Sequence, residues 1–569
     1  MPRRSPAPSA TAKPEPGTAA AALPSPLPRS GQLVTSAQMR ELDRRTIELG
    51  TPGSVLMERA GQGIADRIRR EFAAAARRGV LVVAGKGNNG GDGFVIARLL
   101  KDRGVRVTVI LLPERESVVG DARLNLDRWR RVRGRTIELE GADPKEVLAA
   151  ELPGAGVVVD AILGTGLSSD VSGPLREAIE AINRAVEADG TSAATSEGGA
   201  GRKRGVRASA PQARTPPVVV AVDLPSGLDG DRGEPRGVAV RATATVTLGA
   251  VKVGLVLPVS RPWVGSLTLV EIGLADAAWE ALDATIEPGS ARTVRPLLPA
   301  RPEGAHKGSN GHLLLVAGSR GKSGAAILAA RGALRGGAGL VTVACPPEAM
   351  ALVAAGAPEI MTEVIRGQSA KEWKERLSGK TAIVVGPGLG TAPHASRLVR
   401  WLVTRAQVPL VLDADGLNAV ASVPDLLAGA TRGLVLTPHP GEMSRLVRRP
   451  VAEIQASRIE SAVALAKRVG AVVVLKGSGT VVADPQGHVT VNTSGCPLLA
   501  AGGTGDVLAG VIGSLLAQGL DPYAAARAGV YLHGAAADRL SSNLGDAGAL
   551  ASEIADEVPR ARHALRSAD

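Results

Sequence analysis

Aromatic side chains make up only 2% of this 569-residue chain, and cysteine occurs only twice, at Cys345 and Cys496. The hydrophobic cores must therefore be built from aliphatic residues, which are abundant because 44% of the chain is hydrophobic. Two cysteines cannot form a disulfide framework or a zinc site of four cysteines. Such scarcity is typical of a reducing compartment, so we expect a cytoplasmic protein.

Long apolar runs are also missing. No stretch of 18 consecutive apolar residues occurs, so we expect no membrane span. Residues 1–30 are rich in Pro, Ala and Ser and lack the continuous apolar segment of a secretory signal. An organellar transit peptide is an alternative for this acid-poor stretch, but its composition favours a disordered tail, which we place at residues 1–33.

The net charge of +12 would fit a nucleic-acid-binding protein if the charge lay on a folded surface. Residues 1–30 hold four basic residues and one acid, and residues 190–217 hold five basic residues and one acid. These two low-complexity stretches therefore carry +7 of the +12. We interpret them as solvated segments, the second as a disordered insertion at about 187–217, and expect no nucleic-acid partner.

The first half alternates apolar strands with helices, which predicts an α/β domain with a parallel sheet. Strands are expected at Gly79–Ala84, Gly156–Asp160 and Val218–Val222, each followed by a polar loop with glycine. Because the carboxyl ends of parallel strands share one edge, these loops should line one crevice, with Asp160 and Asp223 in it. Either Asp by itself is equally compatible with a turn or cap residue.

The loop after the first of these strands has the spacing G-x-G-x-x-G at Gly85, Gly87 and Gly90, before a helix expected to begin at Phe94. A dinucleotide-binding fingerprint also needs an acidic residue at the end of the next strand. The nearest acids, Glu114 and Glu116, lie beyond Pro113, so an ordinary NAD-dehydrogenase site is disfavoured.

The second half repeats the alternation, with strands expected at His312–Ala317, Leu340–Ala344, Thr381–Val385, Val408–Leu412, Gly433–Leu436 and Ala471–Leu475. We place the domain boundary near Glu287–Gly289, which gives domains at 34–280 and 290–569. Gly321-Lys322-Ser323 resembles the end of a P-loop, but Val316 occupies the position of the required first glycine, so a P-loop is rejected.

Gly502–Asp506 precedes an apolar helix, and free amide groups at a helix N-terminus form an anion site. The carboxylate of Asp506 would repel a phosphate, but it suits a base that takes a proton from a hydroxyl attacking a phosphoryl group. The alternative is a glycine turn with Asp506 as a cap. Lys476 and His439 follow strands and are candidate ligand contacts, with a solvated lysine and a structural histidine as the alternatives.

Nine motifs in order make the ordered chain resemble the bifunctional NAD(P)H-hydrate repair enzymes. They are NNGGDG (Asn88–Gly93), DAILGTG (Asp160–Gly166), DLPSGLDG (Asp223–Gly230), HKGSNG (His306–Gly311), GPGLG (Gly386–Gly390), DADGLN (Asp413–Asn418), LTPHPGE (Leu436–Glu442), KGSGT (Lys476–Thr480) and GGTGD (Gly502–Asp506). The resemblance implies a Rossmann-like, three-layer epimerase domain followed by a ribokinase-like, three-layer dehydratase domain. The first would interconvert the R and S hydrates of NAD(P)H, and the second would dehydrate the S form with ADP, releasing AMP and phosphate.

The resemblance also implies roles for individual residues, with Asp506 and, as our own hypothesis, Asp223 as the catalytic groups. Hydrate contacts in the epimerase domain would come from Asn88, Asn89, Gly90, Gly91, Asp92, Gly164, Thr165, Gly166, Leu167, Ser168, Ser169, Asp170 and Asp223. In the dehydratase domain they would come from Ala325, Gly388, His439 and Asp506, and nucleotide contacts from Lys476, Gly477, Ser478, Gly479, Thr480 and Gly505. Asn89, Asp160 and Ser226 would hold a potassium ion, and magnesium would accompany ADP.

We expect small-molecule substrates and a homo-oligomer. Cys496, Leu498 and the Gly321–Ser323 loop depart from the family pattern, where we expect Asn, Gly and an aromatic residue. Two other interpretations stay open. One is a small-molecule kinase acting on a vitamin or sugar alcohol, and the other is a binding protein whose first domain has lost catalysis.

Overall fold

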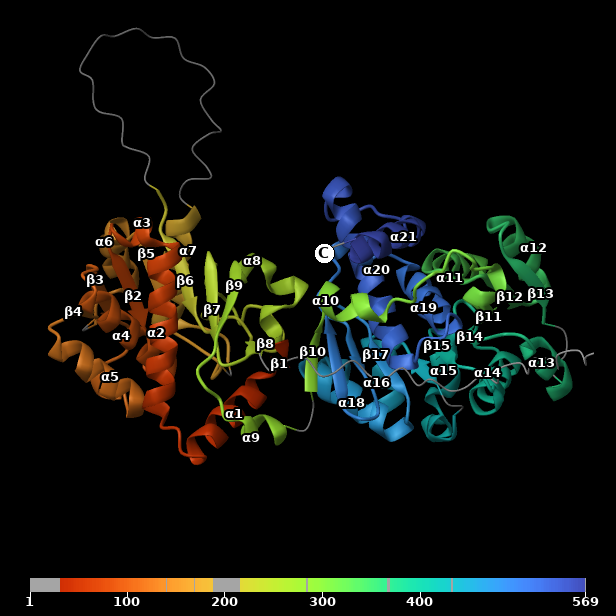
Figure 1. The fold of residues 1–569 in the computed structure, drawn as a ribbon, viewed down its shortest axis with the longest axis horizontal. Coiled ribbons are helices and arrows are strands. Elements are labelled where there is room, and N and C mark those ends of the chain that lie inside the picture. Colours follow the sequence, from red (N-terminus) through yellow and green to blue (C-terminus); the bar gives the residue numbers. More distant parts are fainter. Residues whose placement is uncertain are drawn as a thin grey trace, which may run out of the picture.

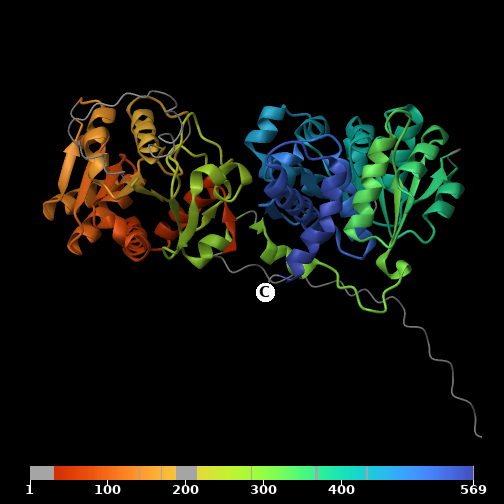
Figure 2. The same cartoon turned by 90° about the horizontal axis from the view of Figure 1, so that it is seen from above.

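The fold is that of a computed structural model, which describes residues 31–139, 141–167, 169–187, 215–282, 285–365, 369–430 and 433–567. Residues 1–30 of the predicted tail and 188–214 of the predicted insertion lie outside the described residues. Two sheets, each with helices on both faces, lie side by side, the N-terminal half in red to yellow and the C-terminal half in green to blue (Figure 1). Figure 2 shows the same two bodies from above.

The described residues of the first half form a seven-stranded sheet in the order β4-β3-β2-β5-β6-β7-β9, and all neighbouring strands run parallel. Its strands are β2 (Val80–Ala84), β3 (Val107–Leu111), β4 (Arg135–Glu138), β5 (Val157–Ala161), β6 (Val218–Val222), β7 (Ala244–Leu248) and β9 (Ser266–Val270). The strand order runs outward from β2 in both directions, so the winding reverses between β2 and β5. A ligand crevice is typical at the carboxyl ends of strands at such a point.

Alternate residues of each strand face opposite helical layers, as the two-residue period of a strand requires. In β2, Val80 and Val82 pack with helices α2, α4 and α5, whereas Leu81 and Val83 pack with α6 and α7. These helices are α2 (Gly53–Glu71), α4 (Asn88–Asp102), α5 (Gly120–Arg131), α6 (Pro144–Glu151) and α7 (Gly173–Glu187), with the short α3 (Ala73–Ala76) after α2. The first half is therefore a three-layer α/β structure.

Small residues set the distance between α2 and α4. A Cβ at Gly61 would lie 2.4 Å from Cγ1 of Val95, so only glycine allows this approach. The close contact holds α4 against α2, and the NNGGDG segment is the start of α4. That segment forms the first turns of α4 from Asn88, so the expectation of a loop lasting to Phe94 was wrong.

The second sheet has twelve strands within the described residues, in the order β13-β12-β11-β14-β15-β16-β17-β18-β19-β10-β1-β8. Its strands are β11 (His312–Val316), β12 (Leu340–Cys345), β13 (Met361–Val364), β14 (Ala382–Val385), β15 (Leu410–Leu412), β16 (Leu434–Leu436), β17 (Val472–Leu475), β18 (Val481–Ala483), β19 (His488–Asn492), β10 (Thr285–Gly289), β1 (Leu33–Val34) and β8 (Val251–Lys252). From β13 to β17 the neighbours run parallel, and the order again runs outward from one strand, β11.

Helices cover both faces of this sheet. One layer contains α11 (Ser323–Gly336), α12 (Pro347–Gly356), α19 (Thr504–Ala517), α20 (Pro522–Leu544) and α21 (Ala551–Ser567), with the short α10 (Ala291–Val294). The other contains α13 (Ala370–Leu377), α14 (Pro393–Arg405), α15 (Asp415–Ala421), α16 (Pro440–Val447), α17 (Val451–Ala456) and α18 (Arg458–Val469). The α/β class and the three-layer arrangement expected from the sequence are confirmed.

Three strands of the second sheet come from residues before position 290. β10 pairs with β19 in parallel, β1 pairs with β10 in antiparallel, and β8 pairs with β1 in parallel. The sequence led us to place a domain boundary at Glu287–Gly289, because Pro and Gly favour turns, but these residues are part of a strand. The ranges 34–280 and 290–569 stay predictions, and the two halves share hydrogen bonds through β10 and β1.

Helix α1 (Ser36–Glu48) follows β1 directly and begins at a capping box, in which Gln38 N donates to Thr35 Oγ1 at 3.1 Å. The short helices α8 (Arg261–Val264) and α9 (Asp276–Glu280) complete the first half. No helix among the described residues is both long and apolar enough to span a membrane.

Candidate functional site

A cavity of about 690 Å³ opens at the carboxyl ends of β2, β5 and β6, at the winding reversal of the first sheet. Of the predicted hydrate contacts it is lined by Asn88, Asn89, Asp92, Gly164, Thr165, Gly166, Leu167 and Asp223. Gly90, Gly91, Ser169 and Asp170 are not among its lining residues, and Ser168 lies outside the described residues. The structure therefore brings together three loops that are far apart in the sequence, as the parallel sheet predicted.

Gly90 supports the loop and not the cavity. A Cβ there would lie 2.0 Å from the carbonyl oxygen of Gly85, so α4 can pass this close to the end of β2 only with glycine. The close passage leaves the first amide groups of α4 beside the cavity.

Asp223 forms an ion pair with Lys252, a lysine that is completely buried. Lys252 Nζ also donates to the carbonyl oxygen of Leu248 at 2.8 Å, and Leu248 N donates to Asp223 Oδ1 at 3.0 Å. Asp223 has a φ of 65°, which few non-glycine residues adopt. This fixed carboxylate thus sits in a strained backbone conformation, as functional residues often do.

Sequence reasoning missed Lys252 and Asp43, which both line the cavity. A signal for Lys252 was present, because it is the one charged residue in the apolar segment Gly249–Pro258. Burial raises the pKa of Asp43 to about 6, with an added contribution from Asp223 that Lys252 opposes. Burial also raises the pKa of Asp92 well above its ordinary value, and the nearby carboxylates Asp223 and Asp43 add to this.

Two of the three predicted potassium ligands, Asn89 and Ser226, contact the carbonyl oxygen of Leu163, and the third, Asp160, contacts Ser226. Asn89 Nδ2 donates to that oxygen at 2.8 Å, and Ser226 Oγ lies 3.2 Å from it. Asp160 is fully buried and accepts from Ser226 N at 2.8 Å. Asn89 Oδ1 is buried without a hydrogen-bond partner in the described structure. An unsatisfied oxygen beside a buried carboxylate fits a hard monovalent cation.

In the second half, Asp506 lies in the first turn of α19, whose N-cap Gly503 has a φ of 90°. Burial raises the pKa of Asp506 to about 7, with further contributions from Asp413, Asp415 and Glu442 that Lys476 opposes. A carboxyl group with a pKa near neutrality is suited to proton transfer. The interpretation of Asp506 as a simple cap does not account for this environment.

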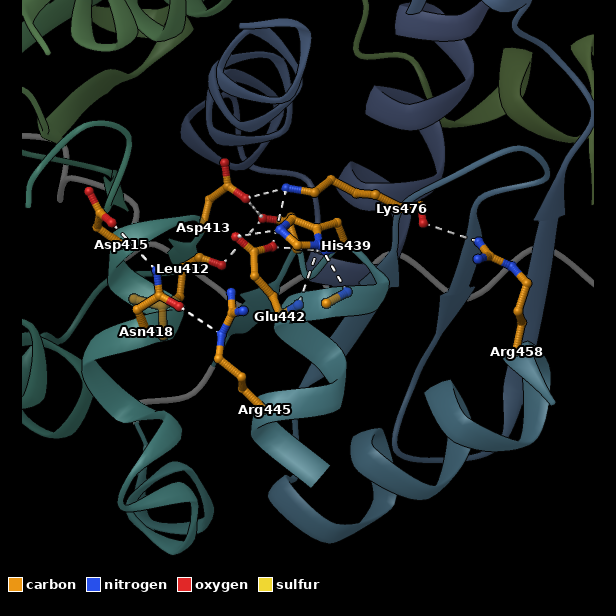
Figure 3. A network of polar contacts seen from close by, with 11 residues as sticks. Leu412, Asp413, Asp415, Asn418, His439, Glu442, Arg445, Arg458 and Lys476 are labelled. Carbon is orange, nitrogen blue, oxygen red and sulfur yellow. Dashed lines mark hydrogen bonds and ion pairs between the residues drawn. The ribbon is translucent and has the colours of Figure 1, made fainter. Parts of the chain in front are cut away.

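Lys476 lies beside the same turn. Its Nζ donates to Asp413 Oδ1 at 2.6 Å and lies 3.8 Å from Glu442 Oε2 (Figure 3). Burial opposes the charge of Lys476, but the two carboxylates raise its pKa, so it stays protonated. A Cβ at Gly505 would lie 3.6 Å from Lys476 Nζ. The cation and the open amide turn thus face one small space, which suits a phosphate.

The remainder of the predicted nucleotide loop is a tight connection between β17 and β18. Thr480 Oγ1 donates to the carbonyl oxygen of Gly477 at 2.9 Å, and Gly477 and Gly479 have φ values of 139° and 62°. Arg458 donates to the carbonyl oxygen of Leu475 at 3.0 Å. It also donates to that of Lys476 at 3.2 Å, which holds the lysine backbone in place (Figure 3).

His439 is the N-cap of α16, and its Nδ1 accepts from Gly441 N at 3.0 Å. Its side chain is 50% exposed, and Nε2 lies 3.5 Å from Glu442 Oε1. Gly388 and Ala325 lie next to each other, because a Cβ at Gly388 would lie 2.9 Å from the Ala325 Cβ. The Gly321–Ser323 loop, which departs from the family pattern, is anchored by Lys322, whose Nζ donates to Asp415 Oδ2 at 3.1 Å.

His533 is a further residue that the sequence did not indicate. Its side chain is buried on α20, burial lowers its pKa to about 4, and its Nε2 has no hydrogen-bond partner among the described residues. It borders Thr504 at the start of α19, so it supports this helix end as a neutral ring.

Comparison with known proteins gives two matches in chain order. The family model described as YjeF-related protein N-terminus matches residues 53–254, and the one described as NAD(P)H-hydrate dehydratase matches residues 313–560. A solved structure of an ADP/ATP-dependent NAD(P)H-hydrate dehydratase from Bacillus subtilis, co-crystallised with ATP and Mg²⁺, is 35% identical. It covers 49% of this chain and 98% of that chain, with a TM-score of 0.43.

Two curated relatives extend over both halves. The bifunctional NAD(P)H-hydrate repair enzyme Nnr of Moorella thermoacetica is 40% identical over 537 residues, which are 93% of this chain and 96% of the relative. The enzyme of the same name from Escherichia coli is 34% identical over 505 residues, 89% of this chain and 88% of the relative. With this similarity over nearly the full length of both chains, the protein belongs to the family of bifunctional NAD(P)H-hydrate repair enzymes, with an epimerase half followed by a dehydratase half.

Proposed function

We propose that this chain restores hydrated NAD(P)H by two reactions at two separate sites. The first half interconverts the R and S hydrates, and the second half uses ADP to convert the S hydrate to NAD(P)H, AMP and phosphate. The observation that carries the proposal is the placement of Asp506, with a pKa of about 7, beside the cation Lys476 and the open turn at Gly505.

In the dehydratase half, the hydroxyl at C6 of the hydrated nicotinamide ring is the nucleophile. Asp506 takes its proton as the oxygen attacks the terminal phosphorus of ADP, and the bond from that phosphorus to the bridging oxygen of AMP breaks. The amide groups of Gly505 and its neighbours, together with Lys476, stabilise the negative charge of the phosphoryl group in transfer. Phosphate is a better leaving group than hydroxide, so it departs from C6 as the C5 proton is lost, and the double bond returns.

Residues around this centre would orient the two substrates. Ala325, Gly388 and His439 would contact the hydrate, and Lys476–Thr480 the nucleotide. The exposed Nε2 of His439 suits this role, because the hydrogen bond from Gly441 N to Nδ1 leaves the proton on Nε2.

In the epimerase half, Asp223 would carry a proton at the hydrate. Its ion pair with Lys252 holds the carboxylate at the cavity that both residues line. The remaining contacts would be those predicted at Asn88–Asp92 and Gly164–Asp170.

Two cations accompany these reactions in the proposal. Potassium would be held by Asn89, Asp160 and Ser226, consistent with the unsatisfied Oδ1 of Asn89, and would fix the loop at Leu163. Magnesium would be bound mainly through the phosphates of ADP, and the carboxylates whose charges act on Asp506 belong to Asp413, Asp415 and Glu442. When bound, it neutralises phosphate charge.

The test is a coupled assay on mixed R and S hydrates with ADP and Mg²⁺, followed by the absorbance of NAD(P)H. We expect complete recovery, because the epimerase half resupplies the S form. Arrest near the initial S fraction would show a silent first half, and the absence of recovery together with turnover of a vitamin or sugar alcohol would favour a small-molecule kinase. The homo-oligomer and the cytoplasmic location stay predictions, which light scattering and cell fractionation can test.

A further inference from the structure

The epimerase cavity contains more carboxyl groups than Asp223 alone. Asp43 comes from α1, where Met39, Arg40, Asp43 and Ile47 line the cavity from one face of the helix. This helix lies before residue 53, where the first family match begins. Asp43 therefore reaches the cavity from a helix outside the residues that the first family model matches.

Within the described residues, Lys252 forms an ion pair with only one of the carboxylates near it. It pairs directly with Asp223, whereas Asp43 has no salt bridge and no side-chain hydrogen bond in the described part of the chain. Asp43 nevertheless lies near enough to both residues of the pair to interact with their charges. A carboxyl group without a partner and a second one held in an ion pair therefore lie in one cavity in different surroundings, which is a typical acid–base arrangement.

Interconversion of the R and S hydrates needs such a pair of groups. The hydroxyl at C6 is attached to a carbon that is bonded to the ring nitrogen N1, so the nitrogen electron pair can expel the oxygen. Departure as water requires a proton donor, and return of water to the other face of the ring requires a proton acceptor.

Resting on the proposed epimerase function, we propose that Asp43 is a second catalytic residue of this site and works as the proton donor to the C6 hydroxyl. The proton of Asp43 passes to the hydroxyl oxygen as the C6–O bond breaks and the N1 electron pair forms a C6=N1 bond, giving water and a cationic ring. Water then adds to C6 from the other face and gives its proton to Asp223, the N1 electron pair is restored, and proton exchange with solvent resets both carboxyl groups.

The test uses the full-length enzyme and two variants on α1. Asp43→Asn removes the transferable proton but keeps the shape, and we expect the rate of R-to-S conversion to fall by roughly 10²- to 10⁴-fold. Glu48→Gln is the matched control, because Glu48 is an exposed residue of the same helix that pairs with Arg44 outside the cavity. It should convert at the wild-type rate. ADP-dependent dehydration of the pure S hydrate should be unchanged in both and reports on folding.

Oxygen labelling tests the bond that breaks. In water enriched in ¹⁸O, each conversion by the wild type should introduce one labelled oxygen into the hydroxyl of the product, measured by mass spectrometry against an enzyme-free sample. Conversion with the original oxygen retained would overturn the proposed step, and a wild-type rate in Asp43→Asn would overturn the role of Asp43. Asp43→Glu, which keeps a carboxyl group, should recover part of the rate lost in Asp43→Asn. Failure of the wild type to convert R to S would instead refute the epimerase function itself.

Discussion

Replacement of Asp506 by Asn should make the dehydratase half more stable and inactive at the same time. The folded environment raises the pKa of Asp506 from 3.8 to about 7, chiefly through burial. This rise corresponds to roughly 4 kcal/mol of unfavourable free energy when the group is ionised. The favourable position of a carboxylate at the N-terminus of α19 offsets about 1 kcal/mol of that, so we expect a gain of about 3 kcal/mol.

The gain should depend on pH in a defined direction. Below about pH 4 Asp506 is protonated in both the folded and the unfolded chain, so the substitution has no electrostatic effect there. Between about pH 4 and pH 7 the unfolded chain loses the proton first, so the wild type loses stability as the pH rises. Above about pH 7 the full penalty is present, and the Asn variant, which avoids it, shows its full advantage.

Thermal unfolding of the ligand-free protein at a series of pH values measures this effect. The unfolding temperature of the dehydratase half should rise by roughly 5 to 10 °C in Asp506→Asn near pH 8, and by far less near pH 4. Asp546→Asn, at an exposed position of the same half, should change neither stability nor activity. A shift of the same size at both pH values, or dehydration that survives the substitution, would refute the reasoning.

Four further outcomes follow from the geometry. Wild-type dehydration should fall about tenfold per pH unit below pH 7, because only ionised Asp506 accepts the proton; a flat profile from pH 5 to 8 would contradict this. Gly505→Ala should keep or slightly increase stability, since Ala favours helices by about 1 kcal/mol, but should raise the KM for ADP because the new methyl group enters the space before Lys476. Lys252→Met should destabilise the first half by roughly 3 to 5 kcal/mol and stop epimerisation, measured by denaturant titration and hydrate conversion. Asn89→Ala should remove any difference in epimerase rate between potassium and lithium buffers, and a retained difference would place the cation elsewhere.

The sequence predicted the class of fold and the strand-end loops because buried parallel strands are continuous apolar runs followed by glycine and polar residues. Asp160 and Asp223 could be placed at a sheet edge for that reason, whereas Asp506 was placed by the glycine cluster before an apolar helix. The same logic could not find β10, because Pro288 and Gly289 are typical of turns and the pairing with β19 depends on contacts across about 200 residues.

The sequence predicted where the two sites lie better than it predicted the other side chains that surround the predicted residues there. Lys252 and Asp43 reach the epimerase cavity from a two-residue strand and from one face of a helix, neither of which carries a glycine motif. His533 lies inside a long apolar helix where no pattern separates it from a core residue. These residues belong to the sites because the fold brings them close to residues that are distant in the sequence, and a single sequence does not show which distant residues become neighbours.

The sheet that crosses from one half to the other has a consequence for synthesis of the chain. The partner of β1 on one side, β8, is complete once about 250 residues of the chain have been made. Its partner on the other side, β10, joins β1 to the rest of the second sheet by pairing with β19, which ends at Asn492. As the polypeptide leaves the ribosome, the first half can fold early, whereas its connection to the second sheet closes only when most of the chain has been made. The first half can thus build its own core long before it is joined to the second sheet, whereas the second half still lacks α19, α20 and α21 when β19 is complete.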